Sequence, residues 1–273
     1  MFHRLIIIFL LLMSILSNAS DKKVYKFGIV PQFEARKIRD IWNPILKEIE
    51  QKTGHKFLIV GSPRIPDFEA SFMRGDFDFA YMNPYHSLIA LDTQQYQPLV
   101  RDHKRKLYGI IAVAKDSNIK SIDQLMNMRI AFPAPNALGA SLMTRAALKQ
   151  KKIKFDPIYV QTHTSAYLNV LLGKASAAGG VFGTFSQQKK NIRDNLKIIF
   201  ETKKVSPHPI VAHPRVPKAV VENIKKALLE MGKDKQLNKL LQKIPIKKIG
   251  VAKIEDYKEL RGMELEKSYV KPN

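Results

Sequence analysis

The sequence predicts an α/β protein with two lobes, each a mostly parallel sheet flanked by helices. Strand-like and helix-like segments alternate as βαβαβ between residues 24 and 81, a pattern typical of parallel sheets with helices on their faces. A second series begins after residue 132, and the first resumes after residue 205. The chain is therefore expected to leave one lobe, build the other and return, which requires two hinge crossings.

The elements follow from local patterns. Residues 24–30 alternate and are rich in β-formers, which indicates a strand. A helix follows with apolar side chains at 38, 41, 42, 45, 46 and 49, and Gly54 is its expected stop. Further strands are expected at 57–60, 77–81, 98–100, 108–114, 129–132, 158–160, 175–182, 196–200 and 210–212. Further helices are expected at 65–73, 86–90, 121–125, 142–149, 165–172, 218–231 and 237–243.

The first residues have the pattern of a secretory signal. Arg4 precedes an apolar run, and small residues stand at Ser17 and Ala19. We expect cleavage after Ala19, so that residues 1–19 form a signal peptide; an uncleaved membrane anchor is the alternative. No later segment approaches spanning length. The mature protein is expected in the periplasm, without stable membrane insertion and as a monomer.

The remaining chain divides at the two crossings, expected near 108–114 and 199–207. Residues 20–108 with 205–273 form the first predicted lobe, and residues 109–204 form the second. The net charge is +22, and the second lobe is the most cationic part, with 15 basic and 5 acidic residues. Such charge also suits nucleic acid, but the leader and the missing nucleic-acid motifs argue against it. Solvated lysines, or a field that concentrates small anions, are the alternatives.

Catalysis, metals and cofactors find little support in the sequence. The absence of cysteine excludes disulfides, cysteine metal sites, thiol nucleophiles and a lipid-attached cysteine. The histidines have no metal-ligand spacing, and neither a nucleophile elbow nor a phosphate-binding Walker loop is found. We therefore expect a binding protein without a cofactor, and an enzyme on the same scaffold is the weaker alternative.

Two segments are candidates for binding a ligand. The strand at 77–81 ends at Asn83-Pro84, where Tyr81, Asn83 and Tyr85 offer hydroxyl and amide groups at the carboxyl end of a strand. Tyr81 is equally consistent with a core residue. The other candidate is 136–141, a loop entering a helix, whose free backbone N–H groups favour an anion. An ordinary capped helix is the alternative there. The residues expected to contribute are Asn136, Ala137, Gly139, Ala140 and Ser141.

Several motifs stand in a characteristic order between residues 24 and 231. They are Phe27-Gly28-Ile29-Val30-Pro31, Asp76-Phe77-Asp78-Phe79-Ala80-Tyr81 with Pro84-Tyr85, Ile111-Ala112-Val113 with Ser121-Ile122-Asp123-Gln124-Leu125, Arg129-Ile130-Ala131-Phe132, Thr162-His163-Thr164, Val170-Leu171-Leu172-Gly173-Lys174 and Ser206-Pro207-His208-Pro209. In this order they resemble the phosphate/phosphite/phosphonate-type substrate-binding proteins of ABC importers. The resemblance implies the two-lobed type II periplasmic binding protein fold.

The resemblance also implies a function and further site residues. A small oxyanion would be held between the lobes and delivered to an ABC permease; a ligand sensor acting on a membrane receptor or kinase is the alternative. His163 matches a ligand-contacting histidine of the family, although helix capping by Thr164 beside an exposed histidine is an alternative. Gln32 and Thr184 complete the expected site. The family's Ser-Thr-Ser-Gly loop is here Asn136-Ala137-Leu138-Gly139, which keeps the glycine and loses the hydroxyls.

Overall fold

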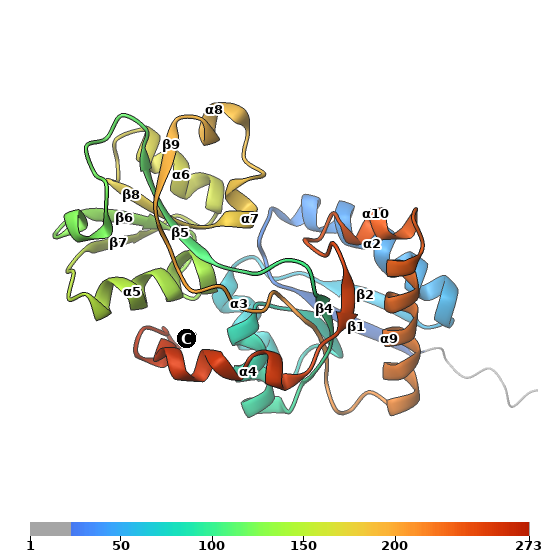
Figure 1. Cartoon of the computed structure of the whole chain (residues 1–273). Helices are drawn as coiled ribbons and strands as arrows, with labels where there is room; N and C mark the ends of the chain where they lie inside the picture. Colours follow the sequence, from blue (N-terminus) through green and yellow to red (C-terminus); the bar gives the residue numbers. More distant parts are fainter. Residues whose placement is uncertain (1–22, 273) are drawn as a thin grey trace, which may run out of the picture.

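The computed structural model describes residues 23–272, so the predicted signal peptide lies outside the described residues. Within them, two sheets form two lobes (Figure 1). The first sheet has the order β11-β4-β10-β3-β1-β2 and the second the order β7-β6-β8-β5-β9. The first contains β1 (Val24–Ile29), β2 (Lys56–Val60), β3 (Phe79–Tyr81), β4 (Gln97–Asp102), β10 (Ile210–Ala212) and β11 (Ile249–Val251). The second contains β5 (Gly109–Ala114), β6 (Arg129–Phe132), β7 (Asp156–Tyr159), β8 (Ala177–Val181) and β9 (Leu196–Glu201).

Helices flank both sheets (Figure 1). The first lobe carries α2 (Ala35–Thr53), α3 (Ile65–Met73), α4 (Pro84–Gln94), α9 (Lys218–Lys233) and α10 (Leu237–Leu241). The second carries α5 (Thr144–Gln150), α6 (His163–Leu171), α7 (Phe182–Phe185) and α8 (Lys190–Arg193), and a π-helical turn, Leu138–Met143, leads directly into α5. No helix in residues 23–272 combines the length and apolar character needed to cross a membrane.

The two-lobed α/β class is confirmed, and the strand directions refine it. Parallel pairing joins β1 to β2 and β3, and β6 to β7 and β8. The strands β5 and β10 pair antiparallel with both of their neighbours. Each of these two strands receives the chain from the other lobe, so it enters its sheet from the opposite end. The expectation of mostly parallel sheets therefore fails at the strands that follow the crossings.

The chain passes between the sheets at 103–108 and 202–209. The two passages pair with each other, because the N–H groups of Leu107 and Val205 each donate to the other residue's carbonyl, at 2.9 and 2.8 Å. The first crossing was expected at 108–114, but residues 109–114 form the buried strand β5, and only Tyr108 lies on the passage. We keep 20–108 with 205–273, and 109–204, as the proposed limits of the lobes.

The C-terminal segment, residues 254–272, contacts both lobes. It lies beside α4 and below α5, drawn in red (Figure 1). Arg261 pairs with Asp92 of α4 at 2.6 Å, and Arg145 of α5 donates to the carbonyl of Ser268 at 2.7 Å. Tyr257 is buried in an apolar cluster that includes residues of both lobes. The segment therefore connects the lobes in addition to the two crossings.

Candidate functional site

A cavity of about 30 Å³ lies between the two lobes. It stands where β1 and β3 of the first lobe end and where the second lobe presents the π-helical turn and the start of α6. Its size corresponds to two or three water molecules, at about 10–15 Å³ of such volume for each. None of its lining side chains is an Asp, Glu, Lys or Arg. The lining residues are Val30, Pro31, Gln32, Ile65, Asn83, Leu107, Pro133, Ala137, Leu138, Gly139, Gln161, His163, Val181 and His208.

The π-helical turn supplies backbone donors to this cavity. A helix start leaves its first N–H groups without intrahelical partners, and those of Leu138, Gly139 and Ala140 have no hydrogen-bond acceptor within residues 23–272. Ala137, Leu138 and Gly139 line the cavity. The positive end of the helix dipole and these amides favour an anion at this position.

Glycines in two neighbouring strands let the turn approach the sheet closely. A Cβ atom added to Gly109 of β5 would overlap the carbonyl oxygen of Gly139. A Cβ atom added to Gly179 of β8 would overlap the carbonyl oxygen of Ala140. The missing side chains therefore determine where the turn lies against β5 and β8, and so where its amides stand in the cavity.

Two histidines from opposite lobes line the cavity. His163 is the first residue of α6, and its buried Nδ1 has no hydrogen-bond partner within the described part of the chain. Burial lowers the pKa of His163 to about 4. Burial, together with the neighbouring His86 and His163, lowers the pKa of His208 to about 3. Both rings are therefore neutral at pH 7, and an anion beside them would favour their protonated forms.

His208 is held in position from two sides. Its Nε2 lies 2.7 Å from Nε2 of Gln32, so the amide of Gln32 donates to the neutral ring. The ring of Tyr81 stacks on it with centroids 5.3 Å apart. Tyr81 is only 2% exposed and also packs against Trp42. Tyr81 is therefore a core residue, the alternative considered for it from the sequence, and it positions His208 through this stacking contact.

The structure brings five of the predicted binding residues to one cavity. Gln32 and Asn83 come from the first lobe, and Ala137, Gly139 and His163 come from the second. Asn83 also caps α4, because its Oδ1 accepts the N–H of His86 at 2.8 Å. The two candidate segments thus face each other, and the anion-binding role of these residues stays a proposal.

The alternative considered for His163, an exposed histidine beside a helix cap at Thr164, is not what the structure shows. The residue that caps α6 is Thr162, whose hydroxyl accepts the N–H of Ser165 at 3.0 Å, and not Thr164. The histidine is partly buried at the cavity rather than exposed.

The other predicted binding residues lie away from the cavity lining. The ring of Tyr85 packs against that of Tyr269 in the C-terminal segment, with the ring centroids 5.8 Å apart. The hydroxyl of Ser141 accepts from Nε of Arg145 at 3.0 Å, because the helix begins before Ser141 and encloses it. Ala140 is buried against β8. Thr184 lies in a neighbouring cavity, and its hydroxyl donates to the carbonyl of Val181 at 2.8 Å.

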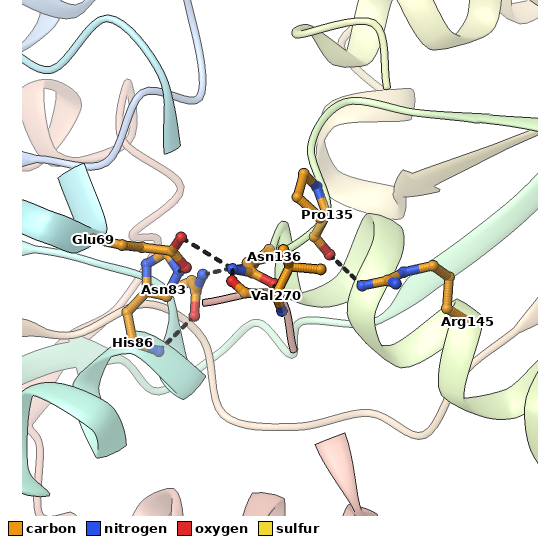
Figure 2. Close-up of polar contacts among 7 residues, drawn as sticks. All are labelled: Glu69, Asn83, His86, Pro135, Asn136, Arg145 and Val270. Atoms are coloured by element: carbon orange, nitrogen blue, oxygen red, sulfur yellow. Dashed lines mark hydrogen bonds and ion pairs between the residues drawn. The ribbon is translucent and has the colours of Figure 1, made fainter. Parts of the chain in front are cut away.

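Asn136 has a different partner set from the one expected. Figure 2 shows its side chain between the lobes, where its Nδ2 donates to Oε2 of Glu69 at 3.0 Å. It also donates to the carbonyl of Val270 at 2.6 Å and accepts that residue's N–H at 3.0 Å. Its amide is therefore occupied by protein groups and joins α3, the second lobe and the C-terminal segment.

Glu69 and His86 form a buried pair behind Asn136 (Figure 2). Both side chains are 0% exposed, and Oε1 of Glu69 lies 2.8 Å from Nε2 of His86. The two atoms lack good hydrogen-bond alignment, so the contact is mainly electrostatic.

Sequence reasoning missed several residues at the site. His208 was left open between the cleft and the surface, and Gln161 was not considered. No signal in the sequence indicated Gln161, but the backbone provides one. Gln161 has a left-handed φ of 70°, a conformation that clusters at functional sites when a residue other than glycine adopts it. Glu69 and His86 had no local signal, because their pairing depends on how α3 packs on α4.

The fold and the interlobe cavity define a two-lobed type II periplasmic binding protein. A family model described as the periplasmic substrate-binding protein of phosphonate ABC transporters matches residues 27–257. The chain belongs to this family. No curated protein sequence matched it.

Solved structures share the fold at low identity. A binding-protein component of an ABC phosphonate transporter from Pseudomonas aeruginosa is 17% identical, with a TM-score of 0.79 over 90% of this chain and 87% of that one. PhnD1 from Prochlorococcus marinus, solved in complex with methylphosphonate, is 18% identical, with a TM-score of 0.81 over 91% and 100%. A Xanthomonas citri protein bound to a chloride ion is 12% identical, with a TM-score of 0.75 over 90% and 98%.

Proposed function

We propose that this protein captures a phosphonate or a related small oxyanion between its lobes and delivers it to an ABC permease. The observation that carries the proposal is the buried start of the π-helical turn. Its first N–H groups have no acceptor within residues 23–272, and its residues Leu138 and Gly139 line the interlobe cavity. The family assignment supports transport over the alternative of a sensor.

The chemistry of the cavity suits a small oxyanion. The donors available to a ligand are backbone amides, the side-chain amide of Gln161, and the rings of His163 and His208. The Nδ2 of Asn83 donates one N–H to the carbonyl of Asn136 at 3.4 Å, which leaves its second N–H for a ligand. The cavity has no carboxylate to repel an anion, and its apolar walls strengthen each hydrogen bond by excluding water. Since the family's loop hydroxyls are missing, these remaining donors must hold the ligand.

A ligand screen tests the proposal directly. Methylphosphonate, phosphite or phosphate at a hundredfold excess over its Kd is expected to stabilise the protein by about 2.7 kcal/mol. For a chain of this size that raises the Tm by roughly 5 to 10 °C. Thermal unfolding with each anion, with acetate and with a neutral sugar as control, measures the effect. A protein that no oxyanion stabilises would contradict the proposal.

The neutral histidines predict pH-dependent binding. The pKa of His163 is lowered to about 4 in the free protein, and a bound anion raises it, so binding takes up a proton between those two pKa values. Affinity is therefore constant at high pH and rises as the pH falls toward 4. Each unit by which the ligand raises the pKa gives about a tenfold gain.

Titration calorimetry with methylphosphonate between pH 4.5 and 8 measures this dependence. His163→Gln is the matched variant, since it keeps a polar side chain without a titrating ring, and comparing the two proteins cancels the ionisation of the ligand. We expect the difference in affinity to widen as the pH falls. Parallel pH profiles would show that His163 does not face the anion.

A further inference from the structure

We infer that the ligand carries a second anionic group, which lies in a cavity adjoining the oxyanion cavity on the hinge side. This inference rests on the proposed function and deepens it, because it names the class of ligand. The class is a phosphonate, or similar oxyanion, whose substituent ends in a carboxylate or another acidic group.

The adjoining cavity, of about 80 Å³, lies next to the proposed oxyanion position. The two cavities share Gln32, Leu107, His163, Val181 and His208 as walls. The two histidines therefore stand at the junction. A ligand whose oxyanion binds at the helix start can extend its substituent past them into the larger space.

The charge of the adjoining cavity has one sign. Its walls include Arg105, Lys106 and Lys243, and none of its lining residues is an Asp or Glu. Within residues 23–272, no carboxylate oxygen lies within 4.0 Å of any of these three side-chain cations. By contrast, the nearby Arg101 is neutralised by Asp256 at 2.8 Å. Positive charge at the adjoining cavity is thus left for a group from outside the chain.

The three cations come from two parts of the chain, the first crossing and the end of α10. Arg105, which is partly buried, and Lys106 lie on the first hinge passage, whereas Lys243 follows α10. Gln187, beyond α7 of the second lobe, adds an uncharged amide to the same walls. An ammonium group here would meet three like charges without a counter-ion, whereas a carboxylate would receive charge-assisted hydrogen bonds.

Comparing ligands that differ only in the substituent tests the inference. Phosphonoacetate and 3-phosphonopropionate carry a carboxylate at two different distances from the phosphonate. We expect the one whose length fits to bind about tenfold more tightly than methylphosphonate, because one hydrogen bond to a charged group contributes about that factor in affinity. We expect 2-aminoethylphosphonate to bind more weakly than methylphosphonate. Titration calorimetry at one pH and ionic strength gives the affinities.

A double variant, Arg105→Gln with Lys243→Gln, is expected to remove the preference for the carboxylate while methylphosphonate still binds. The double variant Lys218→Gln with Lys235→Gln changes two exposed lysines, at the start of α9 and just beyond its end. It removes the same net charge and is expected to keep the preference. If methylphosphonate binds as tightly as both carboxylates, or more tightly, the inference is wrong and the proposed function still stands. Binding of none of these ligands would overturn the proposed function and the inference with it. If the double variant of Arg105 and Lys243 still prefers a carboxylate ligand to methylphosphonate, the inference is also wrong.

Discussion

Replacing Gly179 by alanine is expected to weaken oxyanion binding by a factor of about 100 or more. The new Cβ atom would overlap the carbonyl oxygen of Ala140 and would press on the ring of Phe132. A backbone carbonyl cannot rotate away as a flexible side chain does, so the start of the π-helical turn must move. Losing two backbone hydrogen bonds to a charged oxyanion, at about 1.5–3 kcal/mol each, weakens binding by about a hundredfold or more.

The loss of stability in this variant is expected to be no larger than the loss of binding free energy. Overpacking a tight site typically costs about 1–3 kcal/mol, so Gly179→Ala is expected to remain folded at 25 °C. Titration calorimetry with the best ligand of the screen measures the affinity, and urea unfolding measures the stability.

Gly262→Ala is the matched control, because a Cβ atom there has no neighbour within 4 Å. It is expected to leave both quantities unchanged. Unaltered affinity in Gly179→Ala would mean that the amides of the turn do not hold the ligand.

Local sequence signals predicted much of the fold. The helix at 65–73 and the strands at 129–132 and 210–212 have the expected limits. Gly54 ends α2 with a left-handed φ of 72°, as its place after the last apolar residue indicated. Each of these elements is specified by residues within one or two turns of itself, so pattern and capping are sufficient.

Features that depend on packing were predicted less well. The turn begins at Leu138, four residues before the predicted helix, because glycines far away in β5 and β8 make room for it. The same turn encloses Ser141, which was expected at the ligand. The short strand β11 was missed, since it exists through pairing with β4. The segment facing Asn83 was located correctly, but which of its atoms faces the cavity depends on those distant contacts.

Glu69 is expected to be the most sensitive polar residue for stability. Its carboxylate is 0% exposed and contacts two groups, the ring of His86 within the first lobe and the amide of Asn136 in the second. In Glu69→Ala the ring of His86 loses this partner while it stays buried, and the amide of Asn136 keeps only its bonds to Val270. Removing one member of a buried polar pair costs about 3–5 kcal/mol, and we expect the free energy of unfolding to fall by that amount.

Two further variants separate the contributions. Glu69→Gln keeps the shape and an amide oxygen that accepts from Asn136, so it is expected to lose about half as much as Glu69→Ala. Glu222→Ala breaks an exposed pair with Lys225 on α9 and is expected to change stability by less than about 1 kcal/mol. Urea unfolding of the three variants and the parent protein, at one pH, gives the comparison.

The same substitution tests whether the contact also holds the lobes together. The hydrogen bond from Asn136 to Glu69 crosses from the second lobe to the first, so its loss removes an interaction that holds the lobes together. Ligand affinity is therefore expected to fall along with stability, because the ligand must supply the free energy of closure that this bond no longer provides. X-ray scattering of the ligand-free protein should give a larger radius of gyration for Glu69→Ala than for Glu222→Ala. Equal radii and equal affinities would mean that Glu69 stabilises only its own lobe.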